Sequence, residues 1–190
     1  MQDNIKRIIE DSAGVISSLL SEESIKVIGK ISKKMAETIK GGNKILVFGN
    51  GGSASDSQHL AAELVGRFKK ERRAFPAIAL TANSSTLTAL SNDYGYEKSF
   101  ERQIEGLGKK GDVAIGISTS GNAKNVIAAM EKARSLGLFT IALTGKTGGT
   151  LKSKAGLLLS ADSADTPRIQ EAHILVIHIL CELVEEELVK

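Results

Sequence analysis

The chain has 190 residues, of which 42% are hydrophobic and 25% charged, a balance typical of a soluble globular protein. Its net charge of +3 is too small to indicate a nucleic-acid partner, and no apolar run approaches the roughly 18 residues of a membrane-spanning helix. Residues 1–10 are too polar for a signal peptide, and the single cysteine, Cys181, excludes an intrachain disulfide or a thiolate zinc cluster. The 19 glycines, without any low-complexity linker, are expected to lie at turns.

The first 40 residues contain apolar positions at helical spacing and no convincing strand. A break at Ser21–Ser24 separates two such patterns, and Gly41-Gly42 ends the second. After them, short runs of Ile, Val and Leu predict strands at Ile45–Phe48, Ala77–Leu80, Val113–Ile117, Thr140–Leu143 and Leu157–Leu159. Amphipathic segments predict helices at Asp56–Phe68, Ser85–Leu90, Lys98–Leu107, Ala123–Leu136, shortly after Gly149 and at Arg168–Leu188.

This alternation of strands and helices indicates the fold class. Uninterrupted apolar runs are typical of parallel strands that are covered on both faces. With right-handed crossovers, the order predicts an α/β fold, namely a doubly wound, five-stranded parallel sheet flanked by helices. Because no Pro-, Ser- or charge-rich stretch separates two halves, we expect residues 1–190 to form one domain, with residues 1–40 as an N-terminal helical extension.

Two of the expected strands run directly into loops of small residues that precede helices. The first loop is Gly49–Ser55 and the second is Ser118–Asn122. In an open parallel sheet, ligands bind beyond the carboxyl ends of the strands, where helix N-termini present free N–H groups. Glycine lets the backbone approach an anion closely, and Ser and Thr hydroxyls add donors. The two loops favour a phosphate-binding site over plain tight turns with serine N-caps.

Two nucleotide-binding motifs are incomplete in this sequence. Gly49–Ala54 matches a loose dinucleotide fingerprint, but Thr81–Asn83 stands where that fingerprint expects a carboxylate. Gly145–Thr147 imitates the end of a P-loop, but Thr140 occupies the position of its first glycine. With no tryptophan and 4% aromatic residues, the chain also has little material for base stacking. A phosphosugar is therefore favoured over a nucleotide.

A histidine and a carboxylate lie on the helix that follows the first glycine loop. His59 and Glu63 are four residues apart and hence on one helix face. Such a pair can bind a divalent metal or act in acid–base catalysis. On a solvated face it would have no function, but its position one to two turns beyond the predicted phosphate loop favours the functional interpretation.

The last predicted helix carries polar residues in an apolar run. His173 and His178 are about 140° apart around a helix axis and cannot serve one centre, and either could be a core residue. Gln170 and His178 are about 80° apart around the axis and about 12 Å apart along it. Side chains of one straight helix would barely reach a common metal across that distance. If both residues function, we expect a site shared across subunits, to which each copy contributes one of them.

Six segments of the sequence together carry a family resemblance. They are Gly49–Ser53, His59–Leu64, Asn92–Gly95, Gly116–Asn122, Leu143–Lys146 and Arg168–His173. The chain resembles the phosphoheptose isomerases (sedoheptulose 7-phosphate isomerases) of the sugar isomerase (SIS) domain class over essentially its whole length. The strand–loop motifs are typical of the whole class, whereas the His59/Glu63 and Gln170/His178 sets make the resemblance specific.

The resemblance implies an activity, an assembly and a cofactor. The implied enzyme is an aldose–ketose isomerase that converts sedoheptulose 7-phosphate to D-glycero-D-manno-heptose 7-phosphate through an enediolate. This is the first step of bacterial heptose synthesis for lipopolysaccharide or capsule. The resemblance further implies a cytoplasmic homotetramer with active sites at subunit interfaces, N-terminal helices in those interfaces, one Zn²⁺ per subunit, and no nucleic-acid or membrane partner.

The resemblance also assigns roles to individual residues. The implied substrate-binding residues are Asn50, Gly51, Gly52, Ser53, Glu63, Asn92, Asp93, Ser118, Thr119, Ser120 and Gln170. The implied metal ligands are His59, Glu63, Gln170 and His178, and the implied acid–base pair is Glu63 and His178. Ala123 stands where some family members offer another serine to the ligand, so that contact is not carried over.

Two other functions share part of this pattern. One SIS-domain relative associates as a tetramer with the bacterial replication initiator, and the family pattern implies that it lacks acid–base groups at the positions of Glu63 and His178. Both groups are present here, which favours an enzyme over such a non-catalytic binding protein. The second alternative is isomerisation of another phosphosugar, since the loops do not determine the number of carbons in the substrate.

Overall fold

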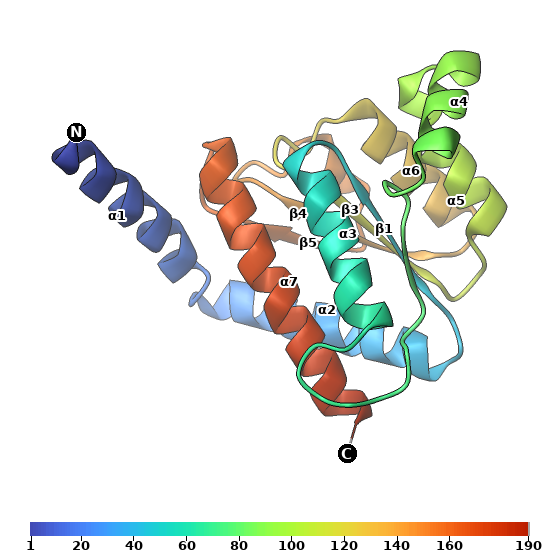
Figure 1. Cartoon of the computed structure of the whole chain (residues 1–190), viewed down its shortest axis with the longest axis horizontal. Coiled ribbons are helices and arrows are strands. Elements are labelled where there is room, and N and C mark those ends of the chain that lie inside the picture. Colours follow the sequence, from blue (N-terminus) through green and yellow to red (C-terminus); the bar gives the residue numbers. More distant parts are fainter. Residues whose placement is uncertain (190) are drawn as a thin grey trace.

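A parallel sheet lies at the centre of the computed structural model, which describes residues 1–189. The strand order is β2-β1-β3-β4-β5, and every neighbouring pair is parallel. The strands are β1 (Ile45–Gly49), β2 (Ala77–Ala79), β3 (Val113–Ser118), β4 (Phe139–Thr144) and β5 (Leu157–Ser160). Helices cover both faces of the sheet (Figure 1). The predicted α/β fold is confirmed, and each strand matches its predicted range to within one residue at either end.

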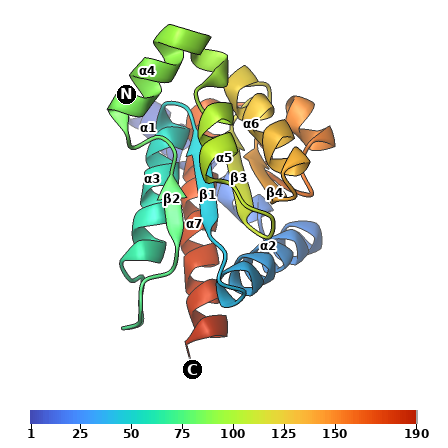
Figure 2. The ribbon, with the colours of Figure 1, turned by 90° about the vertical axis from the view of Figure 1, so that its right-hand side faces the viewer.

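Two hydrophobic clusters flank the sheet, one on each face. Helices α2 (Glu22–Lys40), α3 (Gly52–Val65) and α7 (Thr166–Leu188) cover one face, and α5 (Glu101–Leu107) and α6 (Lys124–Ser135) cover the other. In β1, Ile45 and Val47 pack into the first cluster, whereas Leu46 and Phe48 pack into the second. Burial on both faces explains the uninterrupted apolar run. Figure 2 shows the helices on either side of the strands.

The N-terminal extension consists of two helices, as predicted. Helix α1 (Gln2–Ser18) has no buried residue and projects from the body of the molecule (Figure 1). Ser21 begins α2, and its hydroxyl accepts a hydrogen bond from the Ser24 backbone N–H at 3.3 Å. The Arg168 guanidinium at the start of α7 donates to the Ile8 carbonyl at 2.8 Å and holds α1 to the body.

Helix α3 begins four residues earlier than the sequence predicts. Its N-cap is Gly51, whose φ of 55° is a conformation that favours glycine. The chain therefore turns at Gly51 and becomes helical at once, so that the glycine loop itself forms the first turn of α3. The helix ends at Val65, three residues before the predicted end, because Gly66 breaks the helical conformation.

The middle of the chain also differs from its predicted boundaries. Helix α4 (Ser84–Tyr94) is longer than predicted. The Asn83 side chain caps its start by accepting a hydrogen bond from the Thr86 N–H, and Gly95, with a φ of 87°, ends it. The predicted helix from Lys98 is a short 3-10 helix, η1 (Tyr96–Lys98), followed by α5. A second 3-10 helix, η2 (Gly149–Ser153), follows β4, and α7 begins two residues before its predicted start. Among the described residues, none of the helices combines the length and apolar composition that a membrane crossing requires.

Candidate active site

A cavity of about 370 Å³ opens at the carboxyl ends of β1 and β3. Its lining is Asn50, Gly51, Gly52, Ser53, Ile117, Ser118, Thr119, Ser120, Ala123, Thr166 and Gln170. Three helix N-termini meet there, because Gly52 opens α3, Ala123 precedes α6 and Thr166 opens α7. Free N–H groups and the positive ends of helix dipoles attract anions, and no lining side chain is charged. The cavity therefore suits a phosphate held by neutral donors.

The second loop of the cavity is held in place by the segment that follows β4. The Gly145 N–H donates to the Thr119 carbonyl at 2.9 Å, and the Leu151 N–H donates to the Gly121 carbonyl at 3.0 Å. Gly121 has a φ of 67°, and a Cβ added there would clash with the Gly148 backbone. Only glycine fits this close approach without moving backbone. The loop conformation is thus set before any ligand arrives.

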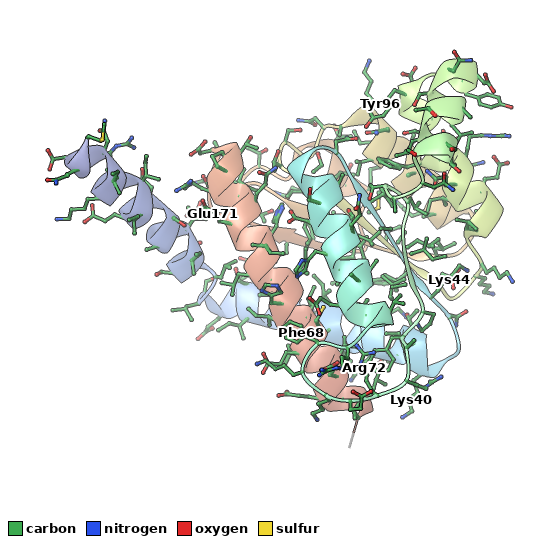
Figure 3. All side chains as sticks on the ribbon, in the orientation of Figure 1. Lys40, Lys44, Phe68, Arg72, Tyr96 and Glu171 are labelled. Carbon is green, nitrogen blue, oxygen red and sulfur yellow. The ribbon has the colours of Figure 1, made fainter. Side chains whose placement is uncertain are left out.

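Asn50, in the first loop, belongs to a side-chain network that the sequence did not indicate. Its amide exchanges two hydrogen bonds of 2.9 Å with the amide of Asn125, a buried residue of α6. The Tyr96 hydroxyl also donates to Asn50 Oδ1 at 2.7 Å. Tyr96 comes from η1 and lies beside the loops at the strand ends (Figure 3). Two donors therefore occupy Asn50 Oδ1 and fix the orientation of its amide. No spacing in the sequence signals these contacts, because they join three separate elements.

His173 is a structural residue and takes no part in the cavity. It is almost fully buried, and its Nε2 lies 3.1 Å from the Thr144 carbonyl oxygen. Burial lowers the pKa of His173 to about 4, although the bond to Thr144 acts in the opposite sense. The neutral ring donates its Nε2–H to the end of β4 and ties the N-terminal half of α7 to the sheet. Of the two interpretations weighed from sequence, the core role is confirmed.

A second group of polar side chains lies on α3 and α7, about two helical turns beyond the cavity. His59 Nε2 lies 2.9 Å from His178 Nε2 and 3.3 Å from Glu63 Oε1. The side chains of His59 and Glu63 are 41% and 25% exposed to solvent, so a ligand can reach them. The structure thus joins three of the predicted functional residues. We call them the His–Glu cluster.

The side of the His–Glu cluster that faces the core is buried. Cys181 is fully buried there, and burial, followed by the nearby charges of Glu63 and Glu185, raises the pKa of its thiol to about 12. The thiol therefore stays protonated and is no nucleophile. Cys181 is thus a small core residue.

The remaining predicted site residues lie apart from the His–Glu cluster within one chain. Gln170 lines the cavity, and its amide lies so close to Gly52 that a Cβ added there would clash with it. Along α7, Gln170 stands about 12 Å from His178, as the helix spacing predicts. Asn92 and Asp93 are exposed on the last turn of α4, where the Asn92 amide donates to Asp93 at 2.8 Å, and they are not part of the cavity lining. Within one chain, the cavity and the His–Glu cluster are therefore two separate groups of polar residues.

The His–Glu cluster contains nitrogen and oxygen donors of the kinds that zinc binds in proteins. In a tetrahedral site with Zn–N bonds of about 2.0–2.1 Å, neighbouring donor atoms are about 3.3 Å apart. The 2.9 and 3.3 Å separations around His59 Nε2 are close to that value. Within residues 1–189, however, no group of three or more His, Cys, Asp or Glu side chains is arranged so that it could hold a metal ion. One chain therefore holds no ready metal site, although the two donor separations around His59 resemble those of one.

Comparison with known proteins identifies the family. The sequence model of the SIS domain matches residues 9–145. A phosphoheptose isomerase of Aquifex aeolicus is 54% identical over 189 residues, which cover 98% of this chain and 97% of that protein. The chain belongs to the SIS-domain phosphoheptose isomerase family. This membership confirms the resemblance seen in the sequence.

Solved structures agree with this assignment. The structure of a phosphoheptose isomerase from Francisella tularensis superposes with a TM-score of 0.93 at 34% identity, covering 97% of this chain and 98% of that one. The structure of phosphoheptose isomerase GmhA from Neisseria gonorrhoeae gives 0.89 at 37% identity, with the same coverage. The chain matches these isomerases over nearly their whole length. The comparisons therefore favour an enzyme over the non-catalytic binding protein.

Proposed function

We propose that the chain is a phosphosugar aldose–ketose isomerase that converts sedoheptulose 7-phosphate to D-glycero-D-manno-heptose 7-phosphate through an enediolate. One observation carries this function. A carboxylate and two imidazoles meet on α3 and α7, the same two helices whose N-termini border an anion-binding cavity. The choice of substrate is supported by 54% identity, over nearly the whole chain, to a phosphoheptose isomerase.

The cavity supplies binding energy away from the reacting carbons. Its helix N-termini and the hydroxyls of Ser118, Thr119 and Ser120 hold the phosphate. Binding energy from a remote phosphate can hold the open-chain sugar in its reacting geometry. Gln170 and the Asn50 loop complete the pocket around the sugar hydroxyls.

The His–Glu cluster moves the proton. The Glu63 carboxylate removes the proton from the carbon next to the carbonyl, and the resulting enediolate is reprotonated on the neighbouring carbon. The His178 imidazole transfers protons at the two sugar oxygens, because a histidine exchanges protons near neutral pH. These roles agree with the positions of both side chains on the accessible side of the α3–α7 pair.

We further propose that His59, Glu63 and His178 hold a Zn²⁺ ion, with Gln170 as a further ligand from another copy of the chain. The bound ion would polarise the substrate carbonyl as a Lewis acid. The spacing of the donor atoms in the cluster supports this assignment. Loss of one equivalent of zinc on substitution of His59 by Ala, measured by elemental analysis, is the expected result. Unchanged zinc content would contradict it.

We also propose a homotetramer with shared active sites. In one chain, Gln170 and the His–Glu cluster lie too far apart along α7 to meet at one ion. Helix α1 exposes Ile5, Ile8 and Ile9, and an apolar groove lies between α1, α2 and α7. Copies that pack through these surfaces would bring one chain's cavity to another chain's cluster. We expect inactive Gln170 and His178 variants to regain activity when mixed as hybrid oligomers, and no recovery would contradict a shared site.

We propose that this reaction is the first step of bacterial heptose synthesis for lipopolysaccharide or capsule, and that the protein acts in the cytoplasm. The decisive experiment is to incubate the purified protein with sedoheptulose 7-phosphate, with and without a chelator, and to measure the aldoheptose 7-phosphate formed. Absence of turnover with any added divalent metal would overturn the proposed function. Turnover of a different phosphosugar alone would correct the substrate.

A further inference from the structure

A buried ion pair joins the loop after α3 to the last turns of α7, below the His–Glu cluster. Arg72 Nε donates to Glu185 Oε1 at 2.8 Å, and the two side chains are only 3% and 1% exposed. Figure 3 shows Arg72 and Phe68 between the C-terminal ends of α3 and α7. None of the roles proposed above uses this pair.

The Glu185 carboxylate organises the backbone of the loop around itself. Its two oxygens accept hydrogen bonds from the N–H groups of Phe68, Lys69 and Lys70 at 2.8, 2.8 and 2.9 Å. Burial opposes ionisation of Glu185, but these three donors and Arg72 outweigh it and lower its pKa to about 2. The carboxylate therefore stays charged and keeps residues 68–70 in one conformation.

The Arg72 guanidinium holds the end of α3. Its Nη1 donates to the carbonyls of Leu64 and Gly66 at 2.9 and 3.1 Å, and its Nη2 donates to the carbonyl of Glu63 at 2.8 Å. The guanidinium carbon lies 3.9 Å from the centre of the Phe75 ring, and this contact fixes the plane of the guanidinium group. Carbonyls that would be left free at the helix end are thereby bound in a rigid arrangement.

Both branches of this network end at residues assigned to catalysis. On one side, Glu185 positions the loop that carries Phe68, whose ring stacks on the His178 imidazole with centroids 5.6 Å apart and planes 27° apart. On the other side, Arg72 binds the backbone of Glu63 itself. A shift of the pair would therefore move the imidazole and the carboxylate together.

We propose that Arg72 and Glu185 are positioning residues of the isomerase site, which through Phe68 and the end of α3 set the placement of His178 and Glu63. The inference rests on the proposed function of these two residues. A buried ion pair by itself contributes little stability beyond that of well-packed apolar side chains. Its fixed hydrogen-bond geometry, however, orients the groups that it binds. Misplacement of a reacting group by about 1 Å can cost about a hundredfold in rate.

The test compares variants of the pair with a matched variant of an exposed pair in the same place. Arg72→Lys keeps the charge but loses the planar set of guanidinium donors. We expect kcat to fall roughly tenfold to a hundredfold, with KM changed less than about threefold. Phe68→Leu leaves every hydrogen bond of Arg72 and Glu185 intact, and we expect a smaller fall in kcat. Glu182→Gln removes the exposed ion pair between Glu182 and Lys69 and should leave kcat unchanged.

A spectroscopic measurement separates placement from activity. The ring C–H resonances of His178, assigned with a His178→Asn variant, should shift in both Arg72→Lys and Phe68→Leu, because the stacked Phe68 ring shields them. The Phe68→Leu/Arg72→Lys double variant should lose less activity than the product of the single losses. A folded Arg72→Lys variant with unchanged kcat and unchanged His178 resonances, or a folded Phe68→Leu variant with unchanged kcat, would overturn the proposal.

The two proposals fail in different ways. If the unmodified protein turns over no phosphosugar, the proposed function fails, while the His178 resonances still report whether Arg72 and Phe68 place the ring. If Arg72→Lys fails to fold, shown by loss of its cooperative thermal transition, Phe68→Leu carries the test alone. Normal kcat in that variant would overturn the positioning role.

Discussion

The cavity at the strand ends and the His–Glu cluster are built in opposite ways. The cavity consists of backbone, hydroxyls and three helix N-termini, and neighbouring backbone holds its loops, as at Gly121 and Gly145. In the cluster, His59 and Glu63 share one face of α3, and His178 reaches them only because α7 packs against α3 in this register. In the proposed enzyme, substrate binding would therefore rest on many small contributions, whereas the chemistry would depend on a few groups that surrounding residues must hold in position.

The strongest test of this contrast is to disable the His–Glu cluster and leave the cavity intact. Glu63→Gln keeps the shape of the side chain but removes the base, and we expect kcat to fall by about 10³-fold or more. Affinity for inorganic phosphate, measured by calorimetry, should change less than about threefold, because the cavity contains no part of Glu63.

A distant carboxylate provides the control for that variant. Glu105 lies on α5, where it pairs with Arg102 and Lys132 near the surface, and Glu105→Gln should behave like the unmodified protein. Near-normal turnover by Glu63→Gln would remove Glu63 as the base.

The converse test damages the cavity and leaves the cluster in place. In Gly121→Ala the new Cβ would meet the Gly148 backbone, and the residue would keep an unfavourable φ of 67°. We expect a loss of about 3 kcal/mol in the free energy of unfolding and a large rise in KM. Gly42→Ala is the matched control, because Gly42 has a φ of 78° with open space around it and should cost only about 1 kcal/mol. Equal losses, measured by chemical denaturation, would show that the close approach is unimportant.

Asp56, on α3 between the two regions, allows a test by pH. In the part of the chain that the structure describes, its Oδ2 is buried without a hydrogen-bond partner. Burial raises the pKa of Asp56 to about 6 from 3.8, partly offset by His59. The folded state thus binds the proton more tightly than the unfolded state, and stability falls as the pH rises from about 4 to 6. Asp56→Asn removes this loss.

We therefore expect Asp56→Asn to be more stable than the unmodified protein at pH 8, by about 1–3 kcal/mol. Below pH 4 the two proteins should differ little, since Asp56 is then protonated in both states. Denaturant unfolding at pH 4 and pH 8 measures the difference. A gain that is equal at both pH values would exclude the titration of Asp56 as its cause.

The smallest expected effect concerns the orientation of Asn50. Tyr96→Phe removes only the hydroxyl that donates to Asn50 Oδ1, while the two bonds to Asn125 stay. We expect KM to rise by a factor of about 2 to 10, in line with one neutral hydrogen bond, and kcat to change little. Tyr94→Phe is the control, because the Tyr94 ring contacts Arg102 of α5. A change confined to kcat would mean that Tyr96 acts on the chemistry instead.

Much of the cavity could be predicted from the sequence, because its determinants are local. An apolar run followed by small residues and a helix forms a strand, a turn and an anion-binding helix start, whichever neighbours surround it. The position of the first turn was less predictable. Helix α3 starts at Gly52 and not at Asp56, since a glycine at positive φ lets the loop itself become helical.

The sequence by itself determined the five strands, the two glycine loops, and the placement of His59 and Glu63 on one face of a helix, because periodic burial and turn chemistry act over a few residues. Only the tertiary structure decided which distant residues meet. His59 and His178 are 119 positions apart, and Arg72 and Glu185 are 113 apart. Their contacts depend on the register of α3 against α7, which is set by the packing of the whole helical layer on the sheet and by no local pattern.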